Sequence, residues 1–238
     1  MTDALVRLWH HATAAQPVPE PRWVVVTGVV ALALVAYRPT WQRVRLGITV
    51  VHEAGHALVA VLVGRRLSGI RLHSDTSGVT VSRGRPRGPG MVLMLVAGYV
   101  APGLLGLLAA LLLTAGHALG LLWILVLVLL SILVWVRNGY GLLTVVVLGG
   151  ALAAVSLYAG GRVQTTIATL VTWLLLLASP RPLLELLGRG RSGRRGSDAD
   201  QLARVTPLPA LLWVWLLLLA DLAGLIVGAA TLVPQLAS

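Results

Sequence analysis

Hydrophobic residues in this chain form long, nearly unbroken runs that are separated by short polar stretches. Most of the runs approach or exceed the roughly 17–25 residues that a helix needs to cross a bilayer. The pattern therefore predicts about seven transmembrane helices, over residues 23–37, 44–64, 91–114, 118–136, 142–159, 163–178 and 210–232. The first run is short, so we expect Arg22 and Arg38 at its ends to extend toward the membrane surfaces.

Two longer polar segments, residues 65–90 and 181–209, interrupt the apolar runs. In the first, residues 70–73 and 79–82 alternate between apolar and polar, and turn-forming residues lie between them, which predicts a β-hairpin. In the second, a run rich in Gly and Arg leads to Ser197 and Asp198, either of which can cap a short helix. Residues 1–21 form an N-terminal segment, and we expect residues 22–232 to form one membrane-embedded domain.

Composition agrees with a membrane protein. Hydrophobic residues make up 57% of the chain and charged residues 11%, whereas about a quarter of a soluble domain is charged. The net charge of +11 comes from 19 Arg, without any Lys. No groove-reading motif accompanies this charge, so we do not expect nucleic acid as a partner. The bias toward Ala, Arg, Gly, Leu and Val is typical of a GC-rich genome and suggests a bacterial plasma membrane.

The arginines are distributed unevenly over the predicted loops. Segments on one side of the seven-helix alternation (the N-terminus, residues 65–90, the turn at 137 and residues 181–204) contain 15 Arg, and the other side contains 4. Positive residues stay on the cytoplasmic side. The predicted fold is therefore an all-α polytopic membrane protein with a small cytoplasmic β-hairpin after its second helix. Its N-terminus and both long loops are expected in the cytoplasm and its C-terminus outside.

The second apolar run contains the sequence His-Glu-Ala-Gly-His at residues 52–56. On a helix, residues four apart lie on one face, so His52 and His56 can share one Zn²⁺, and Glu53 can act as general base on a metal-activated water. The alternative is a buried histidine pair satisfied by neighbouring helices. Ionisable groups inside a membrane are costly and usually functional, which favours a metal site.

A catalytic zinc needs a third protein ligand. Because the chain has no Cys, that ligand must be an oxygen or a nitrogen. Asp198 and Asp200 lie on the same predicted side as the hairpin. Asp221, in the middle of the last apolar run, needs a partner or a proton. The full set of distant candidates is Asp198, Asp200, Asp221, His73 and His117.

Several short motifs occur together and in order: HEAGH at 52–56, DTSGVT at 75–80, AGYVAP at 97–102, SDA at 197–199 and TPLP at 206–209. In this set the chain resembles the B-type branch of the site-2-protease-like membrane metallopeptidases, over roughly residues 44–220. The resemblance implies an intramembrane zinc peptidase with His52 and His56 as metal ligands and Glu53 as general base. It also makes Asp198 the preferred third ligand, with Asp200 and Asp221 as alternatives. The Leu-Asp-Gly motif of the better-known branch is absent.

The function that follows is an intramembrane zinc metalloendopeptidase with one Zn²⁺ per chain. Its partners would be the lipid bilayer and a membrane protein or peptide substrate, bound in extended form along the hairpin strand at Gly78 and Val79. Asn138 can donate a hydrogen bond to an oxyanion, or it can simply cap a helix. The alternative function is a non-catalytic membrane protein of the same fold that binds or regulates a partner.

Overall fold

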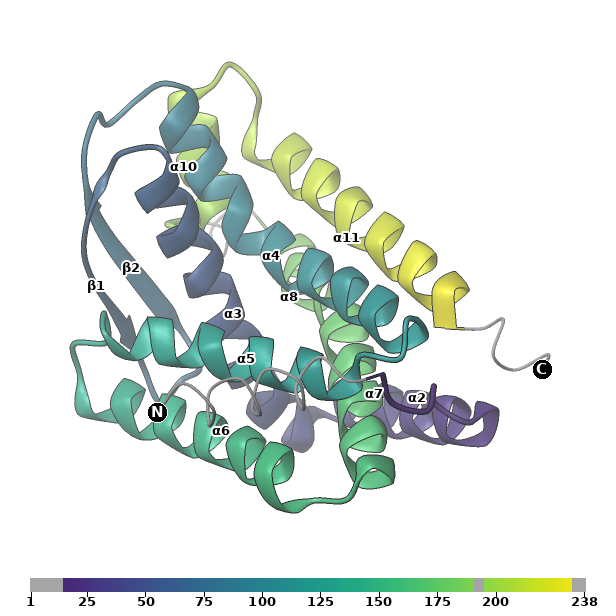
Figure 1. The fold of residues 1–238 in the computed structure, drawn as a ribbon. Helices are drawn as coiled ribbons and strands as arrows, with labels where there is room; N and C mark the ends of the chain where they lie inside the picture. Colours follow the sequence, from purple (N-terminus) through teal and green to yellow (C-terminus); the bar gives the residue numbers. More distant parts are fainter. Residues whose placement is uncertain (1–14, 191–194, 233–238) are drawn as a thin grey trace.

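A computed structural model describes residues 15–190 and 195–232. It contains a bundle of helices and one small antiparallel sheet (Figure 1). The elements are α2 (Pro21–Ala36), α3 (Arg38–Leu62), β1 (Arg66–Leu72), β2 (Gly78–Arg83), α4 (Pro89–Thr114), α5 (Ala118–Leu133), α6 (Gly139–Tyr158), α7 (Gly161–Ala178), α8 (Arg181–Gly188), α10 (Asp198–Val205) and α11 (Ala210–Leu232).

Helix α4 is the centre of the bundle. Helices α3, α7 and α11 all pack against it, whereas α5 pairs with α6 and α2 pairs with α7. The hairpin lies beside α3 on the flank away from α11, and α10 lies near the start of α4 (Figure 1). This arrangement brings the hairpin, α3, α4 and α10 together around one region, although their residues are widely separated in the sequence.

Five helical segments in the described part of the chain are long and apolar enough to cross a membrane. They are Arg38–Leu62, Pro89–Thr114, Gly139–Tyr158, Gly161–Gly188 and Ala210–Leu232. Helices α2 and α5 have 16 residues each. At 1.5 Å per residue each is about 24 Å long, which is shorter than a hydrocarbon core of about 30 Å. The predicted count of seven transmembrane helices is therefore not confirmed.

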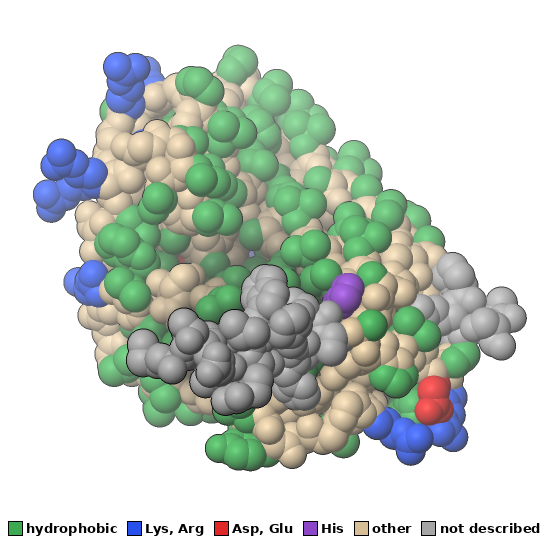
Figure 2. All heavy atoms as spheres, viewed as in Figure 1, with side chains coloured by type: hydrophobic (Ala, Val, Ile, Leu, Met, Phe, Trp, Pro, Cys, Tyr) green, Lys and Arg blue, Asp and Glu red, His purple; other side chains and the backbone are tan. Residues whose placement is uncertain are grey.

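The surface of the bundle is strongly apolar. Large hydrophobic side chains on several helices are more than half exposed, among them Val29, Leu127, Leu143 and Ile226. Figure 2 shows hydrophobic side chains spread over the visible face, with basic side chains at two margins, one on the hairpin side and one at the lower right beside an acidic side chain. A soluble protein rarely exposes so much apolar surface, and this surface is what a helix bundle presents to lipid.

The observed packing corrects the predicted alternation at the N-terminal end. The Gln16 backbone N–H donates to the carbonyl of Gly116, which lies just after α4, and the Gln16 side chain bonds Gln164. Val63, just after α3, lies instead beside Gly90 at the other end of α4. The chain therefore crosses the bundle once between residues 16 and 63, not twice, because α2 and α3 together carry it from one end to the other.

This correction changes the relation between the two ends of the described chain. Leu232, at the end of α11, packs in the same core cluster as Leu113 and Ala118, which lie on either side of Gly116. The start of α2 and the end of α11 thus lie at the same end of the bundle, and the predicted placement of the two termini on opposite sides of a membrane is not confirmed. Arg45 forms an ion pair with Glu185, so it lies beside residues 181–204, one of the arginine-rich segments.

The predicted hairpin is confirmed. Strand β1 pairs with β2 in antiparallel register, with Ile70 opposite Thr80 and an irregularity between Leu67 and Gly69. The outer edge of β1 is closed by backbone hydrogen bonds between Ile70 and residues 135 and 137. In the turn, Asp75 accepts hydrogen bonds from the backbone N–H and the hydroxyl of Ser77, and these bonds lower the pKa of its carboxyl.

Candidate metal centre

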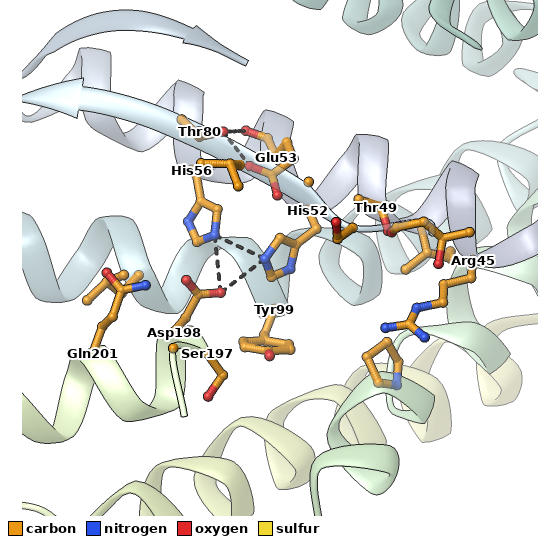
Figure 3. A pocket seen from close by; sticks show the side chains of 18 of the residues that line it. Arg45, Thr49, His52, Glu53, His56, Thr80, Tyr99, Ser197, Asp198 and Gln201 are labelled. Carbon is orange, nitrogen blue, oxygen red and sulfur yellow. Dashed lines mark hydrogen bonds and ion pairs between the residues drawn. The ribbon is translucent and has the colours of Figure 1, made fainter. Parts of the chain in front are cut away.

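Two histidines of α3 point at a common position. The Nε2 atoms of His52 and His56 are 3.0 Å apart, as expected for residues one helical turn apart on one face. Their rings meet edge to face, with centroids 4.6 Å apart. Both rings lie between α3 and α4, where the edge of His52 also packs on Tyr99 at 4.8 Å (Figure 3).

Asp198, at the first residue of α10, completes the cluster. Its Oδ2 lies 3.1 Å from His52 Nε2 and 3.3 Å from His56 Nε2. In the described part of the chain these three residues form the group of His, Asp and Glu side chains that can hold a metal ion. Two ligands of a tetrahedral zinc, with bonds of about 2.0–2.1 Å, are about 3.3 Å apart. The three observed separations therefore fit one zinc ion with a free fourth position.

The hydrogen bonding of His56 prepares it to bind a metal. Its Nδ1 lies 2.7 Å from the backbone carbonyl of Met94. A carbonyl only accepts, so Nδ1 must carry the proton, and in the neutral ring Nε2 then presents its lone pair to the cluster. Met94 belongs to α4, so the packing of α4 on α3 selects the tautomer that ligation requires.

Gly98 provides the space for both imidazoles. A Cβ atom at this position would overlap the His56 ring and approach His52 Cε1 to 2.9 Å. The α4 backbone therefore comes close to the histidine pair only because residue 98 has no side chain. This explains why the segment AGYVAP lies directly opposite HEAGH.

The position of Asp198 depends on how α10 begins and packs. The side-chain oxygen of Ser197 accepts a hydrogen bond from the backbone N–H of Asp200, which caps the helix. Ala199 and Leu202 are fully buried against α4 and α11. Burial alone would raise the pKa of the Asp198 carboxyl, but the neighbouring imidazoles of His56 and His52 outweigh it and hold that pKa well below its usual range. Asp198 is thus a carboxylate, the form that binds metals.

Glu53 lies next to this cluster and is held by the hairpin. Its side chain is 3% exposed, and its Oε2 accepts a hydrogen bond of 2.5 Å from the hydroxyl of Thr80 in β2. A Cβ atom at Gly78 would lie 2.5 Å from Glu53 Oε1, so this glycine leaves the carboxylate its room. Strand β2 thus fixes the side chain that the sequence predicted as general base.

These groups line a cavity of about 290 Å³ between α3, α4, β2 and α10 (Figure 3). Gly78, Val79 and Thr80 form its hairpin wall, and Arg45 and Thr49 lie on its α3 wall. Figure 3 shows His52, His56 and Asp198 converging on one point, with Glu53 on the hairpin side of them. The cavity is large enough for a short stretch of extended peptide beside the cluster.

The other candidate ligands lie elsewhere. Asp200 bonds the Gly196 N–H and the Arg204 guanidinium, and both contacts lower the pKa of its carboxyl. Asp221 is buried in α11 beside Gly103, and its oxygens have no hydrogen-bond partner within the described residues. His73 bonds Ser77 in the hairpin turn, and His117 is the N-cap residue of α5.

Asn138 also lies outside the cavity lining. Its side-chain amide donates to the carbonyl of Leu72 at 2.6 Å and accepts from the N–H of the same residue. Both of its polar atoms are thus used to tie the start of α6 to β1.

Sequence reasoning gave no role to Thr80, Met94 or Gly98. Thr80 and Gly98 belong to the DTSGVT and AGYVAP segments, so a signal was present in the order of the motifs. It did not reveal which atom would contact Glu53 or the histidines. Met94 acts through its backbone carbonyl, which no residue type can indicate.

Comparison with known proteins adds one positive finding. A family model described as peptidase M50B-like matches residues 25–228, most of the chain. The chain belongs to the peptidase M50B-like family. No curated protein and no solved structure matches it. The family is site-2-protease-like, which confirms the resemblance drawn from the motifs, and a membrane-embedded metallopeptidase is the function that this membership suggests.

Proposed function

We propose that this protein is an intramembrane zinc endopeptidase that hydrolyses peptide bonds of membrane-associated protein substrates. The observation that carries the proposal is the convergence of His52, His56 and Asp198 within 3.3 Å of one another, beside the buried carboxylate of Glu53. Family membership over residues 25–228 supports the same reaction class.

Zinc is the metal that suits this set of donors. Two imidazole nitrogens and one carboxylate oxygen form the three-ligand pattern of catalytic zinc sites, which leaves one position for water or substrate. When bound, zinc supplies a Lewis acid for the scissile carbonyl and makes water acidic enough to attack at neutral pH. We assign His52, His56 and Asp198 as its ligands, one ion per chain.

Glu53 moves the proton in this proposal. Its carboxylate accepts a proton as water attacks the peptide carbon and returns that proton to the leaving amine. The Thr80 hydroxyl occupies one carboxylate oxygen, so the other is free to face the attacking water. Burial of Glu53 keeps bulk water from competing for this proton.

Substrate would bind along strand β2 in extended form. Within the described part of the chain, the sheet has two strands, so the edge of β2 away from β1 offers its main-chain groups to a further strand. Gly78 and Val79 lie in the cavity wall at this edge and are the proposed substrate contacts. A helical substrate must unwind first, because its carbonyls are otherwise bonded internally. We do not assign an oxyanion role to Asn138, whose amide is bound to Leu72.

Metal analysis and proteolysis together test the proposal. Purified wild type should hold about one zinc per chain, and His56→Ala and Asp198→Ala should lose it. Asp200→Ala serves as the matched control and should keep it. Glu53→Gln should keep zinc but lose cleavage of a reporter polypeptide. Absence of zinc from wild type after reloading, or an active Glu53→Gln, would contradict the proposal and leave the non-catalytic alternative.

We also propose that the hairpin end of the bundle faces the cytoplasm, as the arginine distribution indicates. The chain contains no Cys, so single cysteines report position without background. Pro86→Cys, in the loop between β2 and α4, and Gly160→Cys at the opposite end are both exposed. In intact cells, an impermeant thiol reagent should label the second and not the first. The reverse pattern would invert the proposed orientation.

A further inference from the structure

A cluster of arginines surrounds a single carboxylate on α8 and adjoins the metal cavity, whose lining includes Arg45. Glu185 Oε1 accepts a hydrogen bond of 2.7 Å from Trp41 Nε1 and lies 3.9 Å from Arg181 Nε. Its Oε2 lies 3.1 Å from Arg45 and 3.5 Å from Arg189. One carboxylate is therefore shared by three guanidinium groups and an indole.

The cluster carries an excess of positive charge. Three arginines against one glutamate leave two charges without a partner. No other carboxylate in the described part of the chain forms an ion pair with Arg45, Arg181 or Arg189. Glu185 and two of these arginines are only about a quarter exposed. Unbalanced charge in a partly buried position at a membrane protein surface favours the binding of an anion.

The guanidinium of Arg181 has a fixed orientation in which it can bind such an anion. Its guanidinium stacks over the ring of Trp41, 4.4 Å from the ring centroid. Stacking uses the face of the guanidinium and leaves its N–H groups at the edges. Arg181 makes no hydrogen bond within residues 15–190 and 195–232, and its contact with Glu185 is at 3.9 Å. A fixed fork of free N–H donors matches the geometry of a phosphate.

An apolar groove adjoins this cluster. It has a volume of about 480 Å³ and runs between α2, α7 and α8. Leu32, Val35, Leu177 and Leu184 form its apolar walls, and Arg181 and Glu185 are its polar lining. Leu32 and Leu184 are more than half exposed, so a chain lying in the groove would cover apolar surface that the fold leaves open.

From these features we infer that α2, α7 and α8 form a binding site for an anionic phospholipid, with its phosphate on Arg181 and Arg189 and an acyl chain in the groove. The ligand must be both anionic and apolar, because the basic cluster and the apolar groove share Arg181. A phospholipid with a net negative headgroup has both properties, and basic pockets between membrane helices are known to select such headgroups. The inference does not depend on the proposed peptidase activity.

Native mass spectrometry of the full-length protein tests this inference directly. The delipidated protein in detergent is titrated with phosphatidylglycerol or with phosphatidylcholine of the same acyl chains. Wild type should retain one phosphatidylglycerol with at least about fivefold preference, since one basic group is worth about that factor. Inorganic phosphate in excess should not displace it. Displacement by phosphate would show an adventitious ion only and would overturn the lipid assignment.

Matched variants separate this site from general charge effects. Arg181→Gln with Arg189→Gln should weaken phosphatidylglycerol binding about 25-fold, at roughly fivefold per charge. Arg162→Gln removes the same charge from an exposed arginine at the opposite end of the bundle and should change binding less than twofold. Equal losses of phosphatidylglycerol affinity in the double variant and in Arg162→Gln would overturn the proposal.

Glu185→Gln gives a test with the opposite sign. Glutamine retains an oxygen that can accept from Trp41, but it removes the negative charge that the lipid phosphate must compete with. Phosphatidylglycerol binding should therefore tighten, by about fivefold. If Glu185→Gln instead weakens binding as much as the arginine variants do, the cluster is structural and the lipid site is refuted. Where Arg181→Gln fails to fold, the exposed Arg189→Gln alone provides the comparison.

Discussion

The hydrogen bond between Thr80 and Glu53 offers the sharpest test of how the fold supports catalysis. Thr80→Val replaces the hydroxyl by a methyl group of nearly the same size. Valine favours strands, so β2 should stay formed. The change thus removes the 2.5 Å contact with Glu53 and leaves His52, His56 and Asp198 untouched.

The expected loss follows from the type of bond. A hydrogen bond to a charged group contributes about 1.5–3 kcal/mol, and its loss leaves a buried carboxylate oxygen unpaired. If that stabilisation serves to hold Glu53 in its reactive position, kcat/KM should fall about 10- to 150-fold, at 1.4 kcal/mol per tenfold. Zinc content should not change, because no ligand is involved.

Cleavage of a labelled unfolded polypeptide, such as casein in detergent, measures the effect. Thr49→Val is the matched control. Thr49 also uses its hydroxyl to join α3 to the hairpin, through a 2.8 Å bond to the carbonyl of Thr76, but it does not touch Glu53. We expect the kcat/KM of this control to stay within about threefold of wild type. The lost hydrogen bond is uncharged and contributes only about 1 kcal/mol, which would lower the free energy of unfolding and not the activity of the folded protein. Thr80→Ser should recover most of the activity.

Two results would refute this reasoning. Unchanged kcat/KM in Thr80→Val, with wild-type zinc content, would mean that Glu53 does not need the hairpin hydroxyl. Equal losses in Thr80→Val and Thr49→Val would mean that docking of the hairpin matters and the orientation of Glu53 does not.

Three further results are expected. Gly98→Ala should lose zinc and fold less stably, because its Cβ would overlap the His56 ring; elemental analysis and thermal unfolding check both effects. Ser197→Ala should cost about 1 kcal/mol of helix capping, and zinc affinity, measured against a chromophoric chelator, should fall about fivefold because Asp198 is in the first turn. Chelation should lower the melting temperature, since zinc at about a thousandfold its Kd stabilises by about 4 kcal/mol; Asp198→Ala should show no such shift.

The membrane helices were largely predictable because an apolar run long enough to cross a bilayer is a local property. The first run was not confirmed as a separate transmembrane helix, for a physical reason. Residues 23–37 are apolar, but α2 has 16 residues, which is short for a bilayer, and it is followed by α3 directly after the break at Tyr37. Hydropathy measures the length of a run and does not reveal whether the next helix turns back.

In the candidate site, too, the residues close together in the sequence were predictable and those brought in by tertiary packing were not. His52, Glu53 and His56 lie within five residues of one another on one helix, so their spacing alone predicted a shared metal. Asp198 is 142 residues beyond His56, and residue types alone left it equal to Asp200 and Asp221. The resemblance to a family favoured it, and tertiary packing of α10 on α4 brings it to the histidines. The contact of Thr80 with Glu53 depends on how a strand lies on a helix, which no local pattern encodes.

The open edge of β2 has a consequence for water. Unpaired main-chain groups cannot face hydrocarbon, because each would lose its hydrogen bonds to solvent. No described residue pairs with the outer edge of β2 through its backbone, so in the membrane-embedded protein that edge must face water or a bound strand and not hydrocarbon. Peptide hydrolysis consumes one water per bond. The strand that would receive the substrate therefore also needs contact with water, the second reactant of the hydrolysis.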